Sequence, residues 1–185
     1  MKNKLNIILA LAMLLMVALP ACKNADQNQQ SVDTATAPQQ ELLENPASQV
    51  VDIAGILNEQ DIKALLDKTN VLDSLKLAQV AIVTVNDLEG KKAIDFATSL
   101  ANKWGVGHND TNDGITILVK PKTSDTPEGK GEATIATGTG MQKILTDSIC
   151  KSIIDKTMLP KFKENKYGEG ISDALDKIKE ILTNK

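Results

Sequence analysis

Apolar positions between residues 49 and 182 follow two different spacings. Helical spacing, with apolar residues three or four positions apart, predicts four helices. Continuous or alternating β-branched runs predict four strands. The expected helices follow Asn58, span residues 93–104, run from Thr146 to Pro160 and cover residues 170–182; the expected strands are 50–53, 79–85, 115–119 and 133–137. The resulting order, β-α-β-α-β-β-α-α, predicts an α/β fold, a three-layer α/β/α sandwich with a central mixed sheet.

Polar residues mark the ends of several of these helices. Asn58 is a good helix N-cap, and the acidic residues Glu59 and Asp61 in the first turn favour the positive end of the helix dipole. Thr146 is expected to cap the helix that carries Cys150, and Pro160 is expected to end it. No internal repeat is visible, so residues 49–185 are interpreted as one domain.

The first 21 residues have the pattern of a secretory signal peptide. Lys2 and Lys4 precede an apolar run, and the exit Leu19-Pro20-Ala21-Cys22 resembles the lipobox of bacterial lipoproteins. This predicts cleavage before Cys22 and lipidation of its thiol; cleavage after Ala21 that leaves a free thiol is the alternative. Residues 22–48 are rich in Gln, Asn, Ala, Ser and Thr and are expected to be a disordered tether.

An anchor of this kind places the protein in the cell envelope. The membrane is then a partner through the lipid, and the domain is exposed to the periplasm or the exterior. We expect a monomer that assists an envelope protein not identified by the sequence. Cys150 lies on an apolar helical stripe and is interpreted as a small buried hydrophobic residue.

The amino-acid composition argues against several kinds of binding site. The formal net charge is −3, and all 21 basic residues are Lys, so no arginine clamp for phosphate is available. The net charge and four scattered aromatic residues argue against nucleic-acid binding. The single histidine, His108, excludes zinc sites rich in histidine and schemes that need paired histidines.

The segment 108–114, HNDTNDG, is the most informative stretch for chemistry. It gathers Asp110, Asp113 and two asparagines before Gly114, and hard cations such as Ca²⁺ prefer several oxygen ligands from such a loop. The full EF-hand pattern is missing. A solvated polar turn before a strand is the alternative interpretation.

Chain topology extends this candidate metal site. If the strand after Asp113 is followed by an antiparallel strand, residues 138–140 end near Asp113, and Asp147 follows close to the same edge. Asp52 is the fourth candidate ligand. If its strand is parallel to the others, it belongs at the opposite edge, and the sequence leaves that choice open.

A series of short motifs resembles the TPM domain family. In chain order they are residues 51–58 (VDIAGILN), 79–85 (QVAIVTV), 104–107 (WGVG), 112–115 (NDGI), 138–140 with 145–147, and 162–171 (FKENKYGEGI). The resemblance implies an α/β/α sandwich, secretion or membrane tethering, and divalent-cation binding in an acidic loop, as in some members. It also implies a phosphatase label, because that activity has been attributed to a plant chloroplast member.

Two functions follow as expectations. The first is a lipid-anchored module that binds divalent cations, Ca²⁺ first and Mg²⁺ as the alternative, through Asp113, Asp110, Asp147 or Asp52, and that serves as an accessory or interaction module. The second is a metal-dependent phosphatase acting on phosphomonoesters; no catalytic residue is assigned, so enzyme activity is left open. A structural role without metal is a third interpretation.

Overall fold

The computed structural model describes residues 42–44, 46–122 and 129–184. All of them lie in one compact unit, Asp33–Lys185. The predicted signal peptide, Cys22 and most of the predicted tether lie outside the described residues. Among the helices in the described ranges, none is long and apolar enough to cross a membrane.

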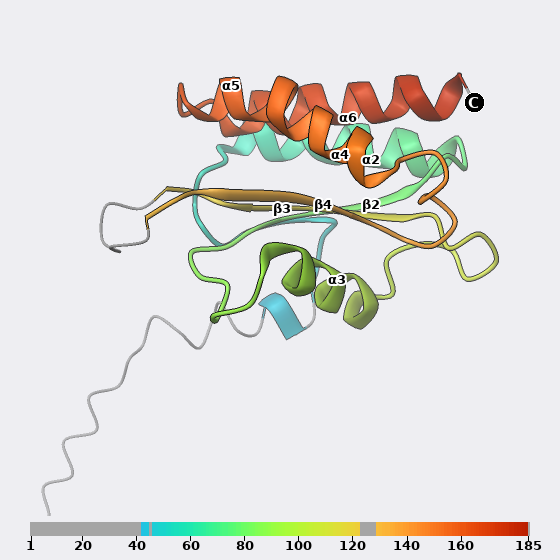
Figure 1. The fold of residues 1–185 in the computed structure, drawn as a ribbon, viewed down its shortest axis with the longest axis horizontal. Coiled ribbons are helices and arrows are strands. Elements are labelled where there is room, and N and C mark those ends of the chain that lie inside the picture. The colour runs from blue at the N-terminus through green and yellow to red at the C-terminus, as the bar shows by residue number, and fades with distance from the viewer. Residues whose placement is uncertain (1–41, 45, 123–128, 185) are drawn as a thin grey trace, which may run out of the picture. The chain divides into compact units, whose positions relative to one another are not determined.

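A four-stranded sheet forms the middle of the domain (Figure 1). Its strands lie side by side in chain order: β1 (Val50–Asp52), β2 (Gln79–Thr84), β3 (Gly114–Lys120) and β4 (Glu132–Thr137). β1, β2 and β3 are parallel, whereas β4 returns antiparallel to β3. The predicted mixed sheet is therefore confirmed.

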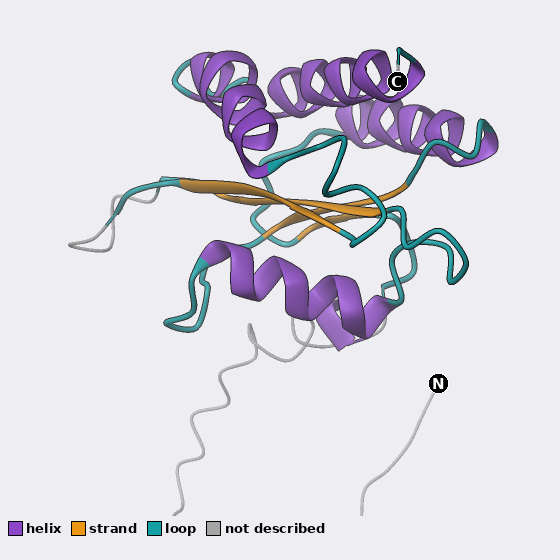
Figure 2. Ribbon diagram, turned by 45° about the vertical axis from the view of Figure 1, so that its right-hand side comes forward, coloured by secondary structure: helices purple, strands orange, loops and turns teal. Residues whose placement is uncertain are grey.

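Helices cover both faces of this sheet (Figure 2). One face carries α2 (Glu59–Ser74), α4 (Asp147–Ile153), η1 (Ile154–Met158), α5 (Leu159–Phe162) and α6 (Tyr167–Thr183). The other face carries α3 (Ala93–Trp104). The α/β/α sandwich is confirmed.

Side-chain alternation along β2 explains the two cores. Val80 and Ile82 pack into the larger core under α2 and α6, while Val83 and Val85 pack against α3. Because each face of the strand is covered, both sets of positions are apolar, and the run looks continuous in the sequence.

The helix caps form as the sequence predicts. The Asp61 backbone N–H donates to Asn58 Oδ1 at 2.8 Å, and the Asn58 N–H donates back to Asp61 Oδ2 at 3.2 Å, which completes a capping box. Thr146 Oγ1 accepts a hydrogen bond from the Ile149 N–H at 3.4 Å. Both predicted caps are confirmed.

The prediction that Pro160 ends its helix is wrong. The helix continues through α5 to Phe162, and the turn before the proline is the π-helix η1. There the Leu159 N–H donates to Ile154 O, five residues back. A proline lacks an N–H and crowds the carbonyl four residues earlier, so a widened turn lets the helix continue past it.

Residues 42–44, at the end of the expected tether, form a helical turn. Leu43 packs against the α3 core, and the Trp104 Nε1–H donates to Leu43 O at 2.9 Å. The folded unit therefore begins earlier than residue 49, because an indole N–H and an apolar contact hold this turn in place.

Candidate cation site at one end of the sheet

Two loops meet where β3 begins. The first, residues 105–113, connects α3 to β3, and the second, residues 138–146, connects β4 to α4. The Gly138 N–H donates to Gly114 O at 2.8 Å, and the Gly140 N–H donates to Asn112 O at 3.1 Å. The expectation that residues 138–140 lie near Asp113 is confirmed.

Glycine is required by the close approach of these loops. A Cβ atom on Gly138 would overlap Asn112 O, and one on Gly140 would overlap Thr111 O. Both obstacles are backbone atoms, which cannot move aside by a change of rotamer. The two glycines therefore allow the acidic loop to pack directly on its neighbour.

Asp113 is buried at the centre of this contact. Its side chain is 4% exposed, and its Oδ1 accepts the His108 backbone N–H at 2.8 Å. The His108 ring Nδ1 lies 3.1 Å from both carboxylate oxygens. With a proton on Nδ1, the ring donates to Asp113, so one residue closes the loop through both its main chain and its side chain.

The electrostatics of Asp113 favour the charged form. Burial raises its pKa, but hydrogen bonds from the His108 backbone and ring, and from Thr111, together lower the pKa below its usual value. Asp113 is therefore a carboxylate that stays ionised although water hardly reaches it.

A second carboxylate, Asp73, approaches from the end of α2. Its Oδ1 lies 3.3 Å from His108 Nε2, close enough for an ion pair when the ring is protonated. The same Oδ1 is buried and makes no properly oriented hydrogen bond within the described residues. The last turn of α2 contains no basic residue, so Asp73 adds negative charge to the negative end of the helix dipole.

Sequence reasoning missed Asp73. It is one of several acidic residues spaced along an amphipathic helix. Its place in the last turn of that helix, which contains no basic residue, is the one signal in the chain that marks it. The role of His108 was also missed, since a histidine in a loop between polar residues is usually exposed.

The structure separates the remaining predicted ligands. Asp110 is exposed in the same loop as Asp113. Asp147 is exposed at the start of α4 and lines a groove beside β4. In the described part of the chain, neither has a hydrogen bond or ion pair with Asp113.

Asp52 lies at the opposite end of the sheet. It is the last residue of β1, whose strand is parallel to β2 and β3, whereas Asp113 immediately precedes β3. Its oxygens accept the N–H groups of Ile56 at 3.2 Å and Leu57 at 2.9 Å. One site cannot therefore contain both Asp52 and Asp113.

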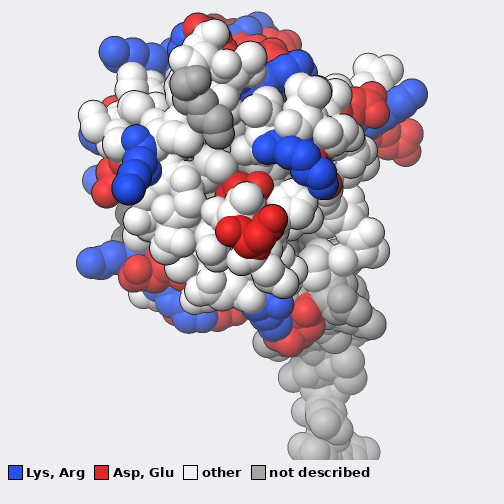
Figure 3. All heavy atoms as spheres, turned by 90° about the vertical axis from the view of Figure 1, so that its right-hand side faces the viewer, with Lys and Arg blue, Asp and Glu red and all other residues white. Residues whose placement is uncertain are grey.

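The residues at the Asp113 end fit a divalent cation in part. Among the described residues, no three or more His, Cys, Asp or Glu side chains are arranged to hold a metal ion. What exists is two carboxylates that contact the two nitrogens of one imidazole, with one buried oxygen that lacks a hydrogen bond. Figure 3 faces this end and shows acidic atoms near the middle, with lysines to either side.

Cys150 is a poor nucleophile in this fold. It is buried, and burial together with the nearby charge of Asp147 raises the pKa of its thiol to about 11. The thiol is therefore protonated at neutral pH, in line with its interpretation as a small hydrophobic residue.

Comparison with protein families supplies the decisive match. The family model for the TPM domain matches residues 50–181, which is nearly all of the described chain. The chain belongs to the TPM domain family. The strand order and the loops around Asp113 described above are thus those of a TPM domain.

Solved structures agree with this assignment. The TPM domain is similar to the solution NMR structure of the N-terminal domain of a protein from P. gingivalis, with 25% identity and a TM-score of 0.63 over 79% of this chain and 87% of that one. The N-terminal domain of cg2496 from Corynebacterium glutamicum shares the fold, at 12% identity and a TM-score of 0.54 over 75% and 80%. No curated protein matches the chain.

Proposed function

We propose that this TPM domain is a lipid-anchored envelope module that binds a divalent cation. The proposed ligands are Asp113, Asp73 and Asp110, at the end of the sheet where β3 begins. The observation that carries the proposal is the buried Asp73 Oδ1, which lacks a hydrogen bond and faces the same imidazole as Asp113. A buried acceptor without a donor is costly, and a cation would satisfy it.

The local field supports a cation over any other ligand. Two carboxylates and the C-terminus of α2 contribute negative charge around His108. Carboxylate, carbonyl and amide oxygens of this kind suit Ca²⁺, and Mg²⁺ is the alternative. Asp110 is close in sequence and exposed, so it is free to turn toward an ion.

Binding is expected to compete with His108. The ring takes up the acceptor capacity of Asp113, so the ion must displace it or share the carboxylate with it. This cost favours weak affinity, in the range of roughly 10⁻⁴–10⁻³ M that extracellular Ca²⁺ modules show.

A calcium titration tests the proposal. Calorimetry and amide NMR on the chain should give saturable heat at millimolar Ca²⁺, with shifts in residues 108–113 and at Asp73. Asp113→Asn should abolish the heat. Asp52→Asn is the matched control at the other end of the sheet and should leave it unchanged. Absence of heat, or loss only in Asp52→Asn, would sink the Asp113 site.

The anchor has a separate test. Cys22→Ala should release the protein from membranes, because several acyl chains are needed for stable attachment and all of them depend on that thiol. Retention of the variant in the membrane fraction would contradict the lipoprotein prediction.

The phosphatase alternative stays a prediction. It needs turnover of p-nitrophenyl phosphate that a chelator abolishes and that Asp113→Asn reduces. With no nucleophile assigned, a metal-activated water would have to attack. Calcium binding without turnover would favour the binding module.

A further inference from the structure

The strand β4 has an unused hydrogen-bonding edge. The Gly138 N–H donates to Gly114 O, and this pair fixes which residues of β4 face β3. Because the direction of the backbone groups alternates, Thr134 and Ala136 face β3, whereas Ala133, Ile135 and Thr137 point their N–H and C=O groups outward. Within the described residues these outward groups have no hydrogen-bond partner, and β4 is the last strand of the sheet.

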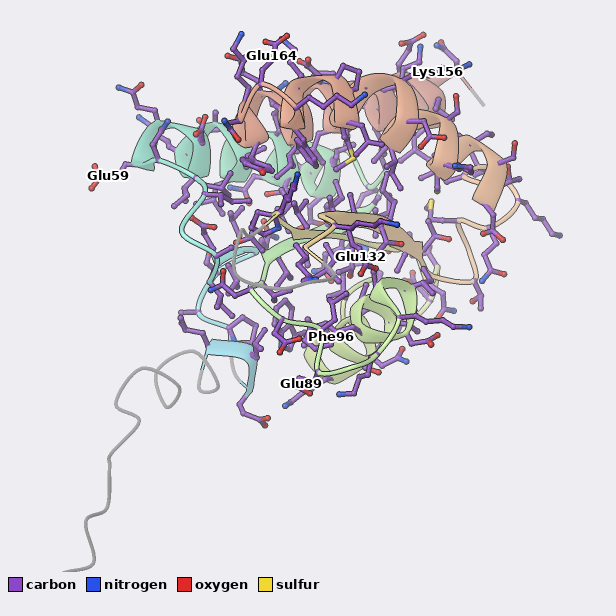
Figure 4. The ribbon with its side chains drawn as sticks, turned by 60° about the vertical axis from the view of Figure 1, so that its left-hand side comes forward. Glu59, Glu89, Phe96, Glu132, Lys156 and Glu164 are labelled. Carbon is purple, nitrogen blue, oxygen red and sulfur yellow. The ribbon has the colours of Figure 1, made fainter. Side chains whose placement is uncertain are left out.

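A groove runs along this edge. It has a volume of about 470 Å³ and its floor is formed by residues 131–135. Ile94 of α3 lies on one side, and Ile154 of η1 and Leu159 of α5 lie on the other. Figure 4 shows Glu132 between the helix that carries Phe96 and the helices that carry Lys156. The edge is thus open, with apolar side chains on both sides of it.

The widened helical turn belongs to the same groove. Ile154 and Asp155 are the first two residues of η1, and both line the groove. The π-helix places them beside β4, and such turns occur frequently at functional sites.

The charged residues that line the groove indicate which kind of partner it would bind. Glu132, Asp147 and Asp155 line it together with a single lysine, Lys151. Lys151 is already paired with Asp155 at 2.7 Å. A second copy would bring the same acidic row against this one and is disfavoured by like-charge repulsion. A basic partner is favoured.

We propose that the free edge of β4 binds an extended segment of another protein, in which lysines or arginines alternate with small apolar residues, as a fifth strand. Backbone hydrogen bonds to Ala133, Ile135 and Thr137 would supply the affinity, and the acidic row would supply selectivity. This names the partner chemistry for the accessory role expected from the sequence and rests on that role alone. It requires no cation.

The test uses the full chain, purified in detergent, and two blocked peptides. One alternates Lys and Val over eight residues, and the other replaces each Lys by Glu. The Lys peptide should bind and protect the amides of Ala133 and Ile135 from hydrogen exchange, and the Glu peptide should bind at least tenfold more weakly.

Three variants locate the binding. Ala133→Pro removes one outward N–H and leaves the ladder with β3 intact, so affinity should fall at least tenfold. Ala133→Val, its matched control, keeps the N–H and should bind as the parent does. Glu132→Lys, on an exposed side chain, should weaken binding severalfold without altering the fold.

Each other outcome would overturn the proposal. These outcomes are no binding at 1 mM peptide, equal affinity in Ala133→Pro and Ala133→Val, or protection centred on residues 108–113. Sedimentation that shows a dimer abolished by Ala133→Pro would assign the edge to a second copy instead. The two proposals fail separately, because Asp113→Asn should lose the calcium heat and still bind peptide.

Discussion

The two ends of the sheet are each closed by an aspartate, yet the two residues have different surroundings. Asp52 follows β1 and accepts the N–H groups of Ile56 and Leu57 and the hydroxyl of Thr84. Asp113 precedes β3 and accepts the N–H and the ring of His108. Among the described residues, the donors to Asp52 are all neutral, whereas Asp113 shares its donor with a second carboxylate, Asp73.

This difference separates structure from candidate function. A carboxylate that accepts backbone N–H groups from its own loop is a local closing device, and Asp52 needs nothing more to explain it. At the Asp113 end, two carboxylates contact one histidine, and the proposed cation site rests on this difference.

The largest contrast is expected from glycine substitutions. Gly140→Ala would place a Cβ against Thr111 O and should cost about 3 kcal/mol or more of unfolding free energy. Gly55→Ala, at the Asp52 end, meets no atom within 4 Å and carries only the strain of its φ of +64°, which costs about 1 kcal/mol. Urea denaturation of both variants measures the difference. Equal losses would show that the loops at the Asp113 end are less tightly packed than described.

The next contrast removes the aspartates themselves. Asp113→Ala leaves the N–H and a ring nitrogen of His108 without their acceptor, at a side chain that is only 4% exposed, and should cost about 2–3 kcal/mol. Asp52→Ala should cost about 1–2 kcal/mol, because its loop is partly exposed and water can replace the carboxylate. Denaturant midpoints of the two variants give the order. A larger loss in Asp52→Ala would reverse the comparison.

The loss of stability at low pH should depend in part on protonation of Asp113. The folded-state pKa of Asp113 lies below its unfolded value near 3.8, so its contribution to stability is complete above that value and is lost as the pH falls through the lower folded pKa. Below about pH 4 the unfolding free energy of the parent should therefore fall more steeply than that of Asp113→Asn. The difference in slope should be no more than about 1.4 kcal/mol per pH unit, the value for one proton. Parallel curves from pH 2 to 5 would contradict this.

The smallest effect on stability is expected at Asp73. Asp73→Asn removes a charge from the C-terminus of α2 and keeps the side-chain shape, so the unfolding free energy should change by less than about 0.5 kcal/mol. The same variant should reduce the calcium heat. Marked destabilisation together with unchanged calcium binding would assign Asp73 to the fold alone.

Much of the fold could be predicted from local patterns. The strand at residues 79–85 is apolar on both faces because both faces are covered, and Asn58 and Thr146 carry their capping chemistry in their own side chains. The prediction that Pro160 ends its helix was wrong because a helix can continue past a proline when one turn widens. The helical turn at residues 42–44 was not predicted because it depends on Trp104, which lies 61 residues away from Leu43 in the chain.

The candidate site was less predictable. Asp113 was found from the density of oxygen ligands in one loop, which is local information. Asp73 could not be found in this way, because its meeting with His108 depends on where α2 ends relative to a loop 35 positions later. Asp52 could be placed only once the direction of β1 was known.

Cys150, the single thiol in the described residues, can report on access to the β4 groove. Cys150 lines the β4 groove and is largely buried, with its Sγ 3.6 Å from Leu145 O and a pKa of about 11. An alkylating reagent should therefore react with it slowly, because little of the thiol is exposed and little of it is thiolate at neutral pH. A strand docked on the neighbouring edge would cover the groove and should slow the labelling further.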